Sequence, residues 1–376
     1  MRLAPFELER FQSTWEHHVD VNLSESGVRP LSVRELVGDG DTLHALLDDA
    51  LIYTQTNGTV PLRAAIASLY PGATPAHVQV TNGGSEANFV VTWHLVEPGD
   101  EVIVQTPAYM QTAGLAQAFG GVVREWPMFF DGARWRVDLE ALGRLVGPRT
   151  RAIVICTPNN PTGARLSAAD LDAIAAVADG CGAWVVSDEI YRGAELDGIE
   201  SASMWGRTPQ AIVTSGLSKA YGLPGLRIGW AVGPPALVET LWGCHDYTTI
   251  APGALSDRLA QIALAPDTRA RLLSRTRAIL NRNVPLVDGW LRDSGLPFTW
   301  TLPEAGAFVF ARYALPVNST RLVTRVREEE NVLVVPGDHF GMDGYLRLGC
   351  GERADYVAEG LARLRAVMQR LSAVTA

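Results

Sequence analysis

The strongest chemical signal surrounds one lysine, Lys219, in the segment SGLSKAYGLPGLRIGW (215–230). It follows an apolar run that predicts a strand, and it lies among Ser, Gly and Tyr with Arg227 eight residues further on. Small residues let a bulky group approach the backbone closely. A Schiff-base lysine needs a lowered pKa, and an arginine nearby can bind an anion. The segment is a candidate for that chemistry; taken alone, a solvated surface lysine is the ordinary alternative.

Two further segments put polar residues at the ends of predicted strands. CTPNNPTG (156–163) contains Asn160, and VVSDEIYRG (185–193) has Asp188 at a strand end with Tyr191 three residues later. In open α/β sheets, ligands bind at the carboxyl ends of the strands. Each segment also has a plain alternative, because Asn-Pro-Thr-Gly is an ordinary turn and a strand-end acid can cap a helix.

These segments lie in a region where short apolar runs alternate with helical patterns. The runs cover 78–81, 101–105, 121–126, 151–156, 183–188, 211–215 and 226–232. Several are continuously apolar and β-branched, which is typical of strands buried on both faces. Between them, Leu171, Ile174, Ala175 and Ala178 recur at helical spacing after Ser167, a candidate N-cap. The alternation predicts an α/β fold with a large, mainly parallel sheet covered on both faces.

The pattern changes after residue 250. Residues 256–295 are charged, amphipathic and helical, with an interruption near Pro266. Shorter strand-like pieces follow (FVFARY, NVLVVPG and YLRLGC), and then a closing helix. We therefore expect a second, smaller α+β domain.

Taken together, TPNNPTG, SDEIY and SKAYGLPGLRIGW resemble the class I/II aminotransferases, pyridoxal-phosphate (PLP) enzymes of fold type I. The three motifs keep this order, with spacings of 28 and 31 residues (160 to 188, 188 to 219). The resemblance runs from YTQTNGTVPLR (53–63) to YLRLGC (345–350). It implies an N-terminal arm with part of the small domain (1–45), a large PLP-binding domain (46–250), and a connecting helix with the C-terminal small domain (251–376). It also implies a homodimer with active sites at the interface.

The resemblance assigns roles to the residues around the cofactor ring. Lys219 matches the Schiff-base lysine, which also moves the α-proton of the substrate. Asp188 matches the carboxylate that pairs with the pyridinium nitrogen, which keeps the ring an electron sink. Tyr191 and Asn160 match the groups that hydrogen-bond the phenolic oxygen. Tyr109 matches the aromatic residue stacked on the ring; a core or interface aromatic is the alternative.

For the cofactor phosphate, the resemblance points to TNGGSEAN (81–88), where a strand turns into a helix. The backbone amides of Gly84, Ser85 and Glu86 would lie at a helix N-terminus, which favours an anion. The remaining candidates are Ser218, Arg227 and Tyr53, the last of which would reach the phosphate of the neighbouring subunit. A plain Gly-rich turn is the alternative at 81–88. The family often has Ser three positions before the lysine, where this chain has Gly216 after Ser215, so phosphate binding is expected to be rearranged or to depend on Ser85 and Ser218.

The substrate side of the site is less defined by motifs. Arg347, in YLRLG, matches the arginine that binds the substrate α-carboxylate through a bidentate pair; a salt bridge at a strand edge is the alternative. Asn160 is expected to contact substrate as well as cofactor. In VNLSESGVRPLS (21–32), Glu25 would meet a cationic or polar side chain and Arg29 an acidic one, or either is simply solvated.

Composition limits the partners. The 376 residues are 47% hydrophobic and 19% charged, with a net charge of −9 and no basic tract, which argues against nucleic acid. No apolar run approaches the ~18 residues of a membrane helix, and the N-terminus is too polar for a signal peptide. Four widely spaced cysteines without a CxxC pair fit a reducing compartment, so a cytoplasmic protein is expected. No histidine spacing predicts a metal site.

The leading hypothesis is a PLP-dependent aminotransferase that exchanges an amino group between an α-amino acid and a keto acid, with specialised or antibiotic metabolism as one setting. The alternative keeps the site but changes the outcome: a lyase, cyclase or decarboxylating or oxidative deaminase that acts on a modified amino acid, because a fold does not fix a reaction. A transcription regulator built on this fold is a third hypothesis. It is disfavoured, because the matching motifs begin by Tyr53 and leave little room for a basic DNA-binding head.

Overall fold

The computed structural model describes residues 3–375. Its largest sheet has seven strands. Strand β10 runs antiparallel to both of its neighbours, and the other neighbouring strands are parallel to each other. In spatial order the strands are β2 (Val78–Thr81), β10 (Gly229–Val232), β9 (Ala211–Gly216), β8 (Trp184–Asp188), β7 (Thr150–Cys156), β3 (Glu101–Thr106) and β4 (Val122–Pro127). The large, mainly parallel sheet expected from the apolar runs is confirmed.

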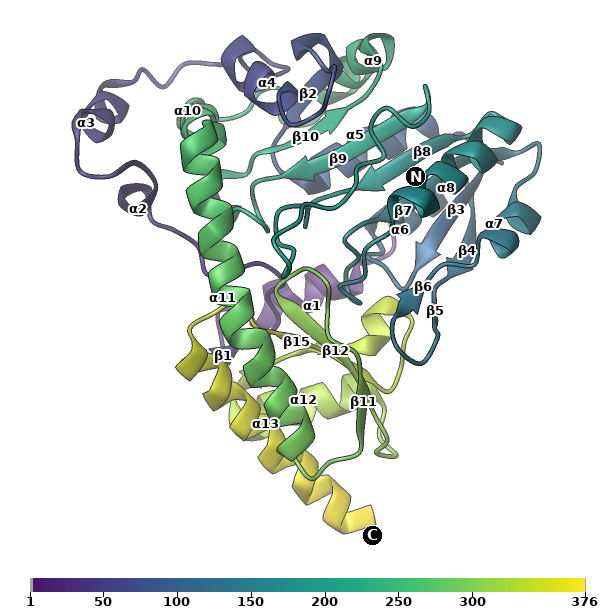
Figure 1. Ribbon diagram of the computed structural model, residues 1–376, viewed down its shortest axis with the longest axis vertical. Helices are drawn as coiled ribbons and strands as arrows, with labels where there is room; N and C mark the ends of the chain where they lie inside the picture. The colour runs from purple at the N-terminus through teal and green to yellow at the C-terminus, as the bar shows by residue number, and fades with distance from the viewer. Residues whose placement is uncertain (1–2, 376) are drawn as a thin grey trace.

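Helices cover both faces of this sheet because its strands are apolar on both faces. In β3, Val102 and Val104 pack in one hydrophobic cluster and Ile103 in another. The first cluster includes residues of α5 (Gly84–Leu95), α6 (Gln111–Ala118) and α9 (Pro235–His245). The second includes residues of α4 (Val60–Ala67), α7 (Leu139–Leu145), α8 (Ala168–Cys181) and α10 (Ala254–Leu264). Figure 1 shows the resulting layered arrangement in the upper part of the molecule.

Local signals explain where several of these elements begin and end. Ser167 caps α8 in a capping box with Asp170, and the helix ends at Gly182 in the left-handed conformation. Two expectations need adjustment. The last strand starts at Gly229 and not near 226, because residues 224–226 form a 3-10 turn and Arg227 has a φ of +51°. The edge strand β4 is mostly exposed, with only Trp126 buried.

A smaller sheet forms the lower part of the molecule (Figure 1). Its spatial order is β11 (Phe298–Trp300), β12 (Phe308–Tyr313), β15 (Tyr345–Gly349) and β14 (Val335–Pro336). The accompanying helices are α11 (Pro266–Asp293), α12 (Ser319–Glu330) and α13 (Ala354–Thr375). The break expected near Pro266 is the junction of α10 and α11.

The two ends of the chain meet beside this smaller sheet. The short strand β1 (Val21–Asn22) pairs in parallel with β13 (Val332–Leu333). Helix α1 (Glu7–Trp15) precedes it, while α2 (Val33–Val37) and α3 (Asp41–Asp48) lie on an arm that stands off at the upper left of Figure 1. The remaining elements are the hairpin β5 (Phe129–Phe130) and β6 (Trp135–Arg136) and 3-10 turns at Pro75–His77, Pro224–Leu226 and Gly337–Phe340. Within residues 3–375, every helix is too short or too polar to span a bilayer.

Candidate active site

A cavity of about 310 Å³ opens where β7, β8 and β9 end, and residues of the smaller sheet and of α1 close it from the other side. Eleven of the residues predicted from sequence line it: Glu25, Gly84, Ser85, Tyr109, Asn160, Asp188, Tyr191, Ser218, Lys219, Arg227 and Arg347. The fold thus gathers residues that lie up to 322 positions apart (25 to 347) in one place. Two predicted residues, Tyr53 and Glu86, do not line the cavity.

Lys219 stands in the turn that follows β9, and it is the only lysine of the sequence. Its side chain is 28% exposed, and Nζ lies 3.8 Å from Oε2 of Glu25. An amine beside a polar cavity wall, reached from a loop of small residues, is accessible to a reacting group. No other lysine side chain of this chain can supply a Schiff base.

Asp188 is the last residue of β8, and both oxygens of its carboxylate accept hydrogen bonds. Asn88 donates from Nδ2 to Oδ2 at 3.2 Å, and the backbone N–H of Ile190 donates to Oδ1 at 3.1 Å. Thr214 donates to Oδ1 of Asn88 at 2.7 Å, which fixes the orientation of that amide. Burial raises the pKa of Asp188, and the hydrogen bonds and the charge of Lys219 limit that rise. A partly buried, oriented carboxylate suits a cationic N–H partner.

Asn88 was missed by the sequence reasoning. It lies on the cavity-facing side of α5, one helical turn after Gly84 and Ser85, and it lines the cavity with them. The spacing of four residues from Gly84 is the only signal that could have found it, because residues i and i+4 share a helix face.

Arg347 comes from β15 of the smaller sheet and is 1% exposed. Its Nη1 donates to Oδ1 of Asn160 at 2.8 Å and its Nη2 to the carbonyl of Ser24 at 2.6 Å. Nε has no partner among the described residues. The guanidinium also lies over the rings of Phe308 and Phe340, at 5.6 and 5.3 Å. An arginine buried with an unused donor and lining a cavity is equipped to bind a carboxylate.

Tyr191 is buried on the same side as Arg347. Its hydroxyl donates to Oγ of Ser26 at 2.9 Å, and its ring packs edge-on against Phe308 at 5.3 Å. Burial raises the pKa of Tyr191, so the phenol stays protonated; its single O–H, which donates to Ser26 here, would have to turn to serve an acceptor in the cavity.

The first turn of α5 forms an anion-binding corner with Arg227 and Ser218. As the first residues of a helix, Gly84 and Ser85 have amides without intrahelical partners. Arg227, in the left-handed conformation, brings Nη1 to 3.5 Å from Oγ of Ser218. A Cβ on Gly83 would overlap the Arg227 guanidinium, so the close approach depends on that glycine.

The unusual Gly216 has a steric explanation. It pairs directly with Gly229 of β10, and a Cβ at Gly216 would come within 2.8 Å of the carbonyl oxygen of Ile228. The preceding Ser215 donates its hydroxyl to the carbonyl of Glu189 at 3.2 Å. Neither residue lines the cavity, which leaves Ser85 and Ser218 as the hydroxyls at the anion-binding corner.

Glu86 faces away from the cavity. Its backbone N–H bonds to the carbonyl of Gly83, and its carboxylate accepts from the backbone N–H of Asn82 at 2.5 Å and from Thr249 at 2.8 Å. His245 Nε2 lies 3.2 Å from the same carboxylate. Burial alone would raise the pKa of Glu86, but these hydrogen bonds outweigh it and bring the pKa to about 2. The side chain therefore ties the start of α5 to the end of α9.

Helix α1 supplies a part of the cavity wall that no sequence motif indicated. Its members at the cavity are Leu8, Glu9 and Gln12, with Glu16 just beyond the helix end. Tyr109 reaches this helix: its hydroxyl donates to Oε1 of Glu9 at 2.7 Å, and its ring meets Phe6 edge-on at 4.8 Å. Burial and the neighbouring Glu9 raise the pKa of Tyr109. Tyr53, by contrast, is 85% exposed and lies apart from these residues.

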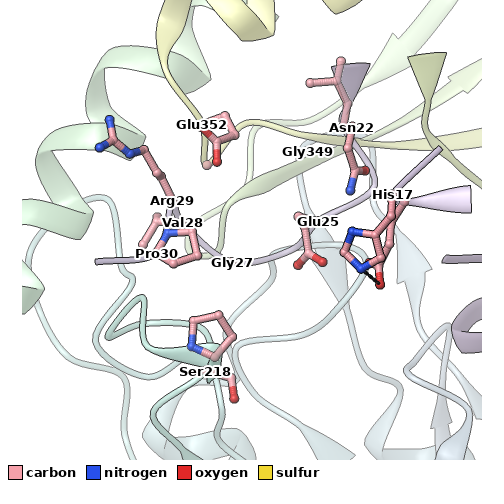
Figure 2. A pocket seen from close by; sticks show the side chains of 14 residues that line it. His17, Asn22, Glu25, Gly27, Val28, Arg29, Pro30, Ser218, Gly349 and Glu352 are labelled. Carbon is pink, nitrogen blue, oxygen red and sulfur yellow. Dashed lines mark ion pairs between the residues drawn. The ribbon is translucent and has the colours of Figure 1, made fainter. Parts of the chain in front are cut away.

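A second cavity of about 260 Å³ adjoins the first, because Glu16, Glu25, Ser218 and Pro224 line both. It extends toward Asn22, Gly349 and Glu352 (Figure 2). Arg29 is also on its border, where its guanidinium lies 3.9 Å from Glu35 and points away from Glu25.

Comparison with known proteins identifies the architecture and its cofactor. Residues 24–364 match the family model described as aminotransferase class I and II. Capreomycidine synthase of Streptomyces vinaceus is 32% identical over 356 residues, which covers 91% of this chain and 88% of that protein. The arginine–pyruvate transaminase AruH of Pseudomonas aeruginosa is 31% identical over 353 residues, with coverage of 87% and 88%.

Among solved structures, a PLP-dependent aminotransferase from Streptococcus suis superposes with a TM-score of 0.92 at 30% identity, covering 99% of each chain. The fold is therefore the fold type I architecture of PLP-dependent transferases, as expected from the motifs. The cofactor is pyridoxal 5′-phosphate, and the chain belongs to the family of class I and II aminotransferases.

Proposed function

We propose that this PLP-dependent aminotransferase uses Lys219 to bond its cofactor and to carry the α-proton of an amino-acid substrate. The observation that supports this most directly is that the only lysine of the chain lines one cavity with Asp188 and Arg347. When bound, the cofactor supplies an electron sink for the negative charge that develops at the substrate α-carbon.

The cavity residues fit the cofactor by charge and by hydrogen bonding. The amides of Gly84 and Ser85 and the side chains of Ser218 and Arg227 would hold the phosphate, since they combine free N–H donors, a hydroxyl and a guanidinium. Asp188 would accept the N–H of the ring nitrogen, because its carboxylate is already oriented by Asn88 and Ile190.

The remaining residues would act on the other ring atoms. The hydroxyl of Tyr191 and the amide of Asn160 would hydrogen-bond the phenolic oxygen, and the ring of Tyr109 would pack on the pyridine face. These donors favour the charged form of that oxygen and so tune the group bonded to Lys219.

On the substrate, Arg347 would bind the α-carboxylate. Its buried Nε is free of partners in the described residues, and its other two nitrogens are fixed by Asn160 and Ser24. A fixed guanidinium orients the α-carbon, so that its proton lies within reach of the Lys219 amine. The Lys219 amine, once the substrate amine has replaced it on the cofactor, would take the proton from the α-carbon and hold it for transfer.

Single-turnover spectroscopy with one amino-acid donor tests transamination. We expect a stoichiometric change of the cofactor absorbance that stops without an acceptor and that a keto acid reverses. Continuous turnover without acceptor, with release of ammonia, water, a thiol or carbon dioxide, would instead establish a lyase, cyclase or deaminase. The 32% identity to capreomycidine synthase is the observation that keeps this second candidate, because that name denotes a synthase and not a transaminase.

We also propose a homodimer in which each partner supplies Tyr53 to the other's phosphate site. Tyr53 is 85% exposed, and the nearby Leu47, Leu51 and Ile52 are 77%, 81% and 68% exposed on the arm that stands off in Figure 1. Such apolar exposure is typical of an interface. Light scattering should give twice the chain mass, and Tyr53→Phe should weaken PLP binding about tenfold; an active monomer would contradict the proposal.

Two organisational proposals accompany this function. Residues 46–250 would act as the cofactor-binding domain, and the two ends, 1–45 and 251–376, as the small domain, in line with the β1–β13 pairing of those ends. The four free cysteines fit a cytoplasmic location, which cell fractionation would test.

A further inference from the structure

We infer that the substrate is an amino acid whose side chain ends in a cation, a guanidinium or an ammonium group, held between Glu16 and Glu25. The inference rests on the proposed function, because it concerns the side chain of the amino acid that Arg347 and Lys219 would hold. It adds Glu16, which no motif indicated, to the substrate site, and it chooses for Glu25 the contact with a cationic side chain among the roles that the sequence left open.

The geometry of the two adjoining cavities defines the path of the side chain. The first contains Arg347 and Lys219, and the second leads away from them; Glu16 and Glu25 line both. Figure 2 shows Glu25 between Ser218 and Gly349 in the second cavity. A substrate anchored at Arg347 with its α-carbon at Lys219 therefore extends past Glu25.

The carboxylates along this path have few partners. The ion pair of Glu16 within the described residues is with its neighbour His17, whose side chain is 83% exposed and lies 3.4 Å away. Glu25 pairs at 3.8 Å with Lys219, an amine that the proposed function commits to the cofactor. When Lys219 is bonded to the cofactor, Glu25, whose side chain is 52% exposed, keeps no ion pair within the described residues.

The arginines at the cavities do not fill this need. Arg227 lies at the anion-binding corner, and Arg347 is buried and fixed by Asn160 and Ser24. Arg29, the residue suited to an acidic substrate, directs its guanidinium away from Glu25 (Figure 2). That guanidinium lies 3.9 Å from the carboxylate of Glu35. Among the described residues that line the second cavity, the carboxylates of Glu16, Glu25 and Glu352 outnumber the basic side chains of Arg29 and His17, and each of these two already lies within 4 Å of a carboxylate, Glu35 or Glu16.

An independent observation fixes the other end of the ligand. Arg347 is 1% exposed, its Nε lacks a partner, and it lines the same cavity as Glu16 and Glu25. A ligand with a carboxylate at one end and a cation at the other satisfies all three groups. A neutral side chain would leave the two carboxylates without an opposite charge beside them.

Equilibrium binding to the PLP-loaded enzyme tests the inference. L-arginine is compared with L-citrulline, which has the same length but a neutral urea group, and L-lysine with L-norleucine. Dissociation constants come from the change in cofactor absorbance, and shifts in melting temperature provide a readout that needs no turnover. We expect L-arginine or L-lysine to bind at least ~10-fold more tightly than its neutral counterpart, the usual effect of a hydrogen bond to a charged group.

Charge-neutralising variants locate the effect. Glu16→Gln and Glu25→Gln should each reduce the preference for the cationic member of the pair about tenfold, while affinity for the neutral member changes by less than about threefold. Glu140→Gln is the matched control, because the Glu140 side chain is 92% exposed and lies outside both cavities; it should change neither affinity.

Three results would overturn the inference: equal binding of the cationic and neutral amino acids, tighter binding of L-glutamate, or an equal loss of both affinities in Glu25→Gln, which would make Glu25 only a positioning residue for Lys219. These results are separable from a failure of the proposed function. If the enzyme prefers cationic amino acids at equilibrium, the inference is supported even when the reaction proves to be elimination or cyclisation. If it transaminates only neutral amino acids, with one cofactor converted per active site, the inference is wrong and the proposed function is supported.

Discussion

The two walls of the active-site cavity are built in different ways. On the wall of the large sheet, Asp188, Asn88 and Lys219 come from strand ends and from the first turns of α5, and hydrogen bonds fix the buried members. On the wall of the N-terminal segment, Glu16 and Glu25 come from irregular chain after α1 and β1, and their side chains are 25% and 52% exposed.

The difference indicates a division of labour. Chemistry that any amino-acid substrate requires depends on a rigid, preorganised wall, because catalytic groups must be held at a fixed geometry. Selection among side chains needs only complementary charge, which exposed carboxylates supply.

The largest effect is expected on the rigid wall at Lys219. Lys219→Ala should lower turnover by about 1,000-fold or more, because a positioned proton carrier contributes on that scale and no other lysine is present to replace it. Borohydride reduction of the PLP-loaded enzyme followed by mass mapping should give one cofactor label per chain, on Lys219. Lys219→Arg keeps the positive charge and should carry no label; retained labelling in either variant would contradict the assignment.

Asp188 tests whether the wall contributes charge as well as shape. Asp188→Asn should keep the fold and some cofactor but lose about 100-fold in turnover, because only the charge opposite the ring nitrogen is removed. Asn88→Ala, which removes the donor 3.2 Å from Asp188 and leaves the charge, should lose less. Stopped-flow rates of the first half-reaction measure both, and near wild-type rates for Asp188→Asn would reduce Asp188 to a structural role.

Arg347 lies where the two walls meet. It donates hydrogen bonds to Asn160 on the wall of the large sheet and to the carbonyl of Ser24 on the wall of the N-terminal segment. Arg347→Lys should lower kcat/KM about 30-fold, mostly through a higher KM, because lysine cannot form the bidentate pair. The exposed Arg321→Lys is the control. A variant with unchanged KM and reduced kcat would show that the guanidinium does not bind the ground-state carboxylate.

The two walls also differ in how far the sequence could predict them. The strand ends around Asn160, Asp188 and Lys219 follow apolar runs whose period identifies the sheet, and a parallel sheet brings its carboxyl ends to one edge. Glu9, Gln12 and Glu16 lie in a short amphipathic segment without a motif, and their approach to the cavity depends on how α1 docks. That docking is a long-range contact, exemplified by Tyr109 and Glu9 at 2.7 Å, which local patterns do not encode.

Glu86 gives the smallest predicted effect and concerns how the rigid wall is kept in place. Its carboxylate has a folded-state pKa of about 2 against an ordinary value of 4.5, because hydrogen bonds from His245, Thr249 and the Asn82 amide favour the charged form despite burial. A carboxyl whose pKa is lowered by folding stabilises the folded state fully above about pH 5, and this contribution is lost as the pH falls toward 2. Glu86→Gln should therefore flatten the pH dependence of the free energy of unfolding between pH 5 and 2, while the exposed Glu140→Gln should leave it unchanged. Urea titrations at several pH values measure how the free energy of unfolding changes with pH.

The effect of Glu86→Gln on the cofactor should be small. Because Glu86 joins the start of α5 to α9 outside the cavity, PLP affinity should fall only a few-fold at pH 7. A loss as large as that of a direct phosphate ligand would mean that Glu86 acts on the cofactor itself.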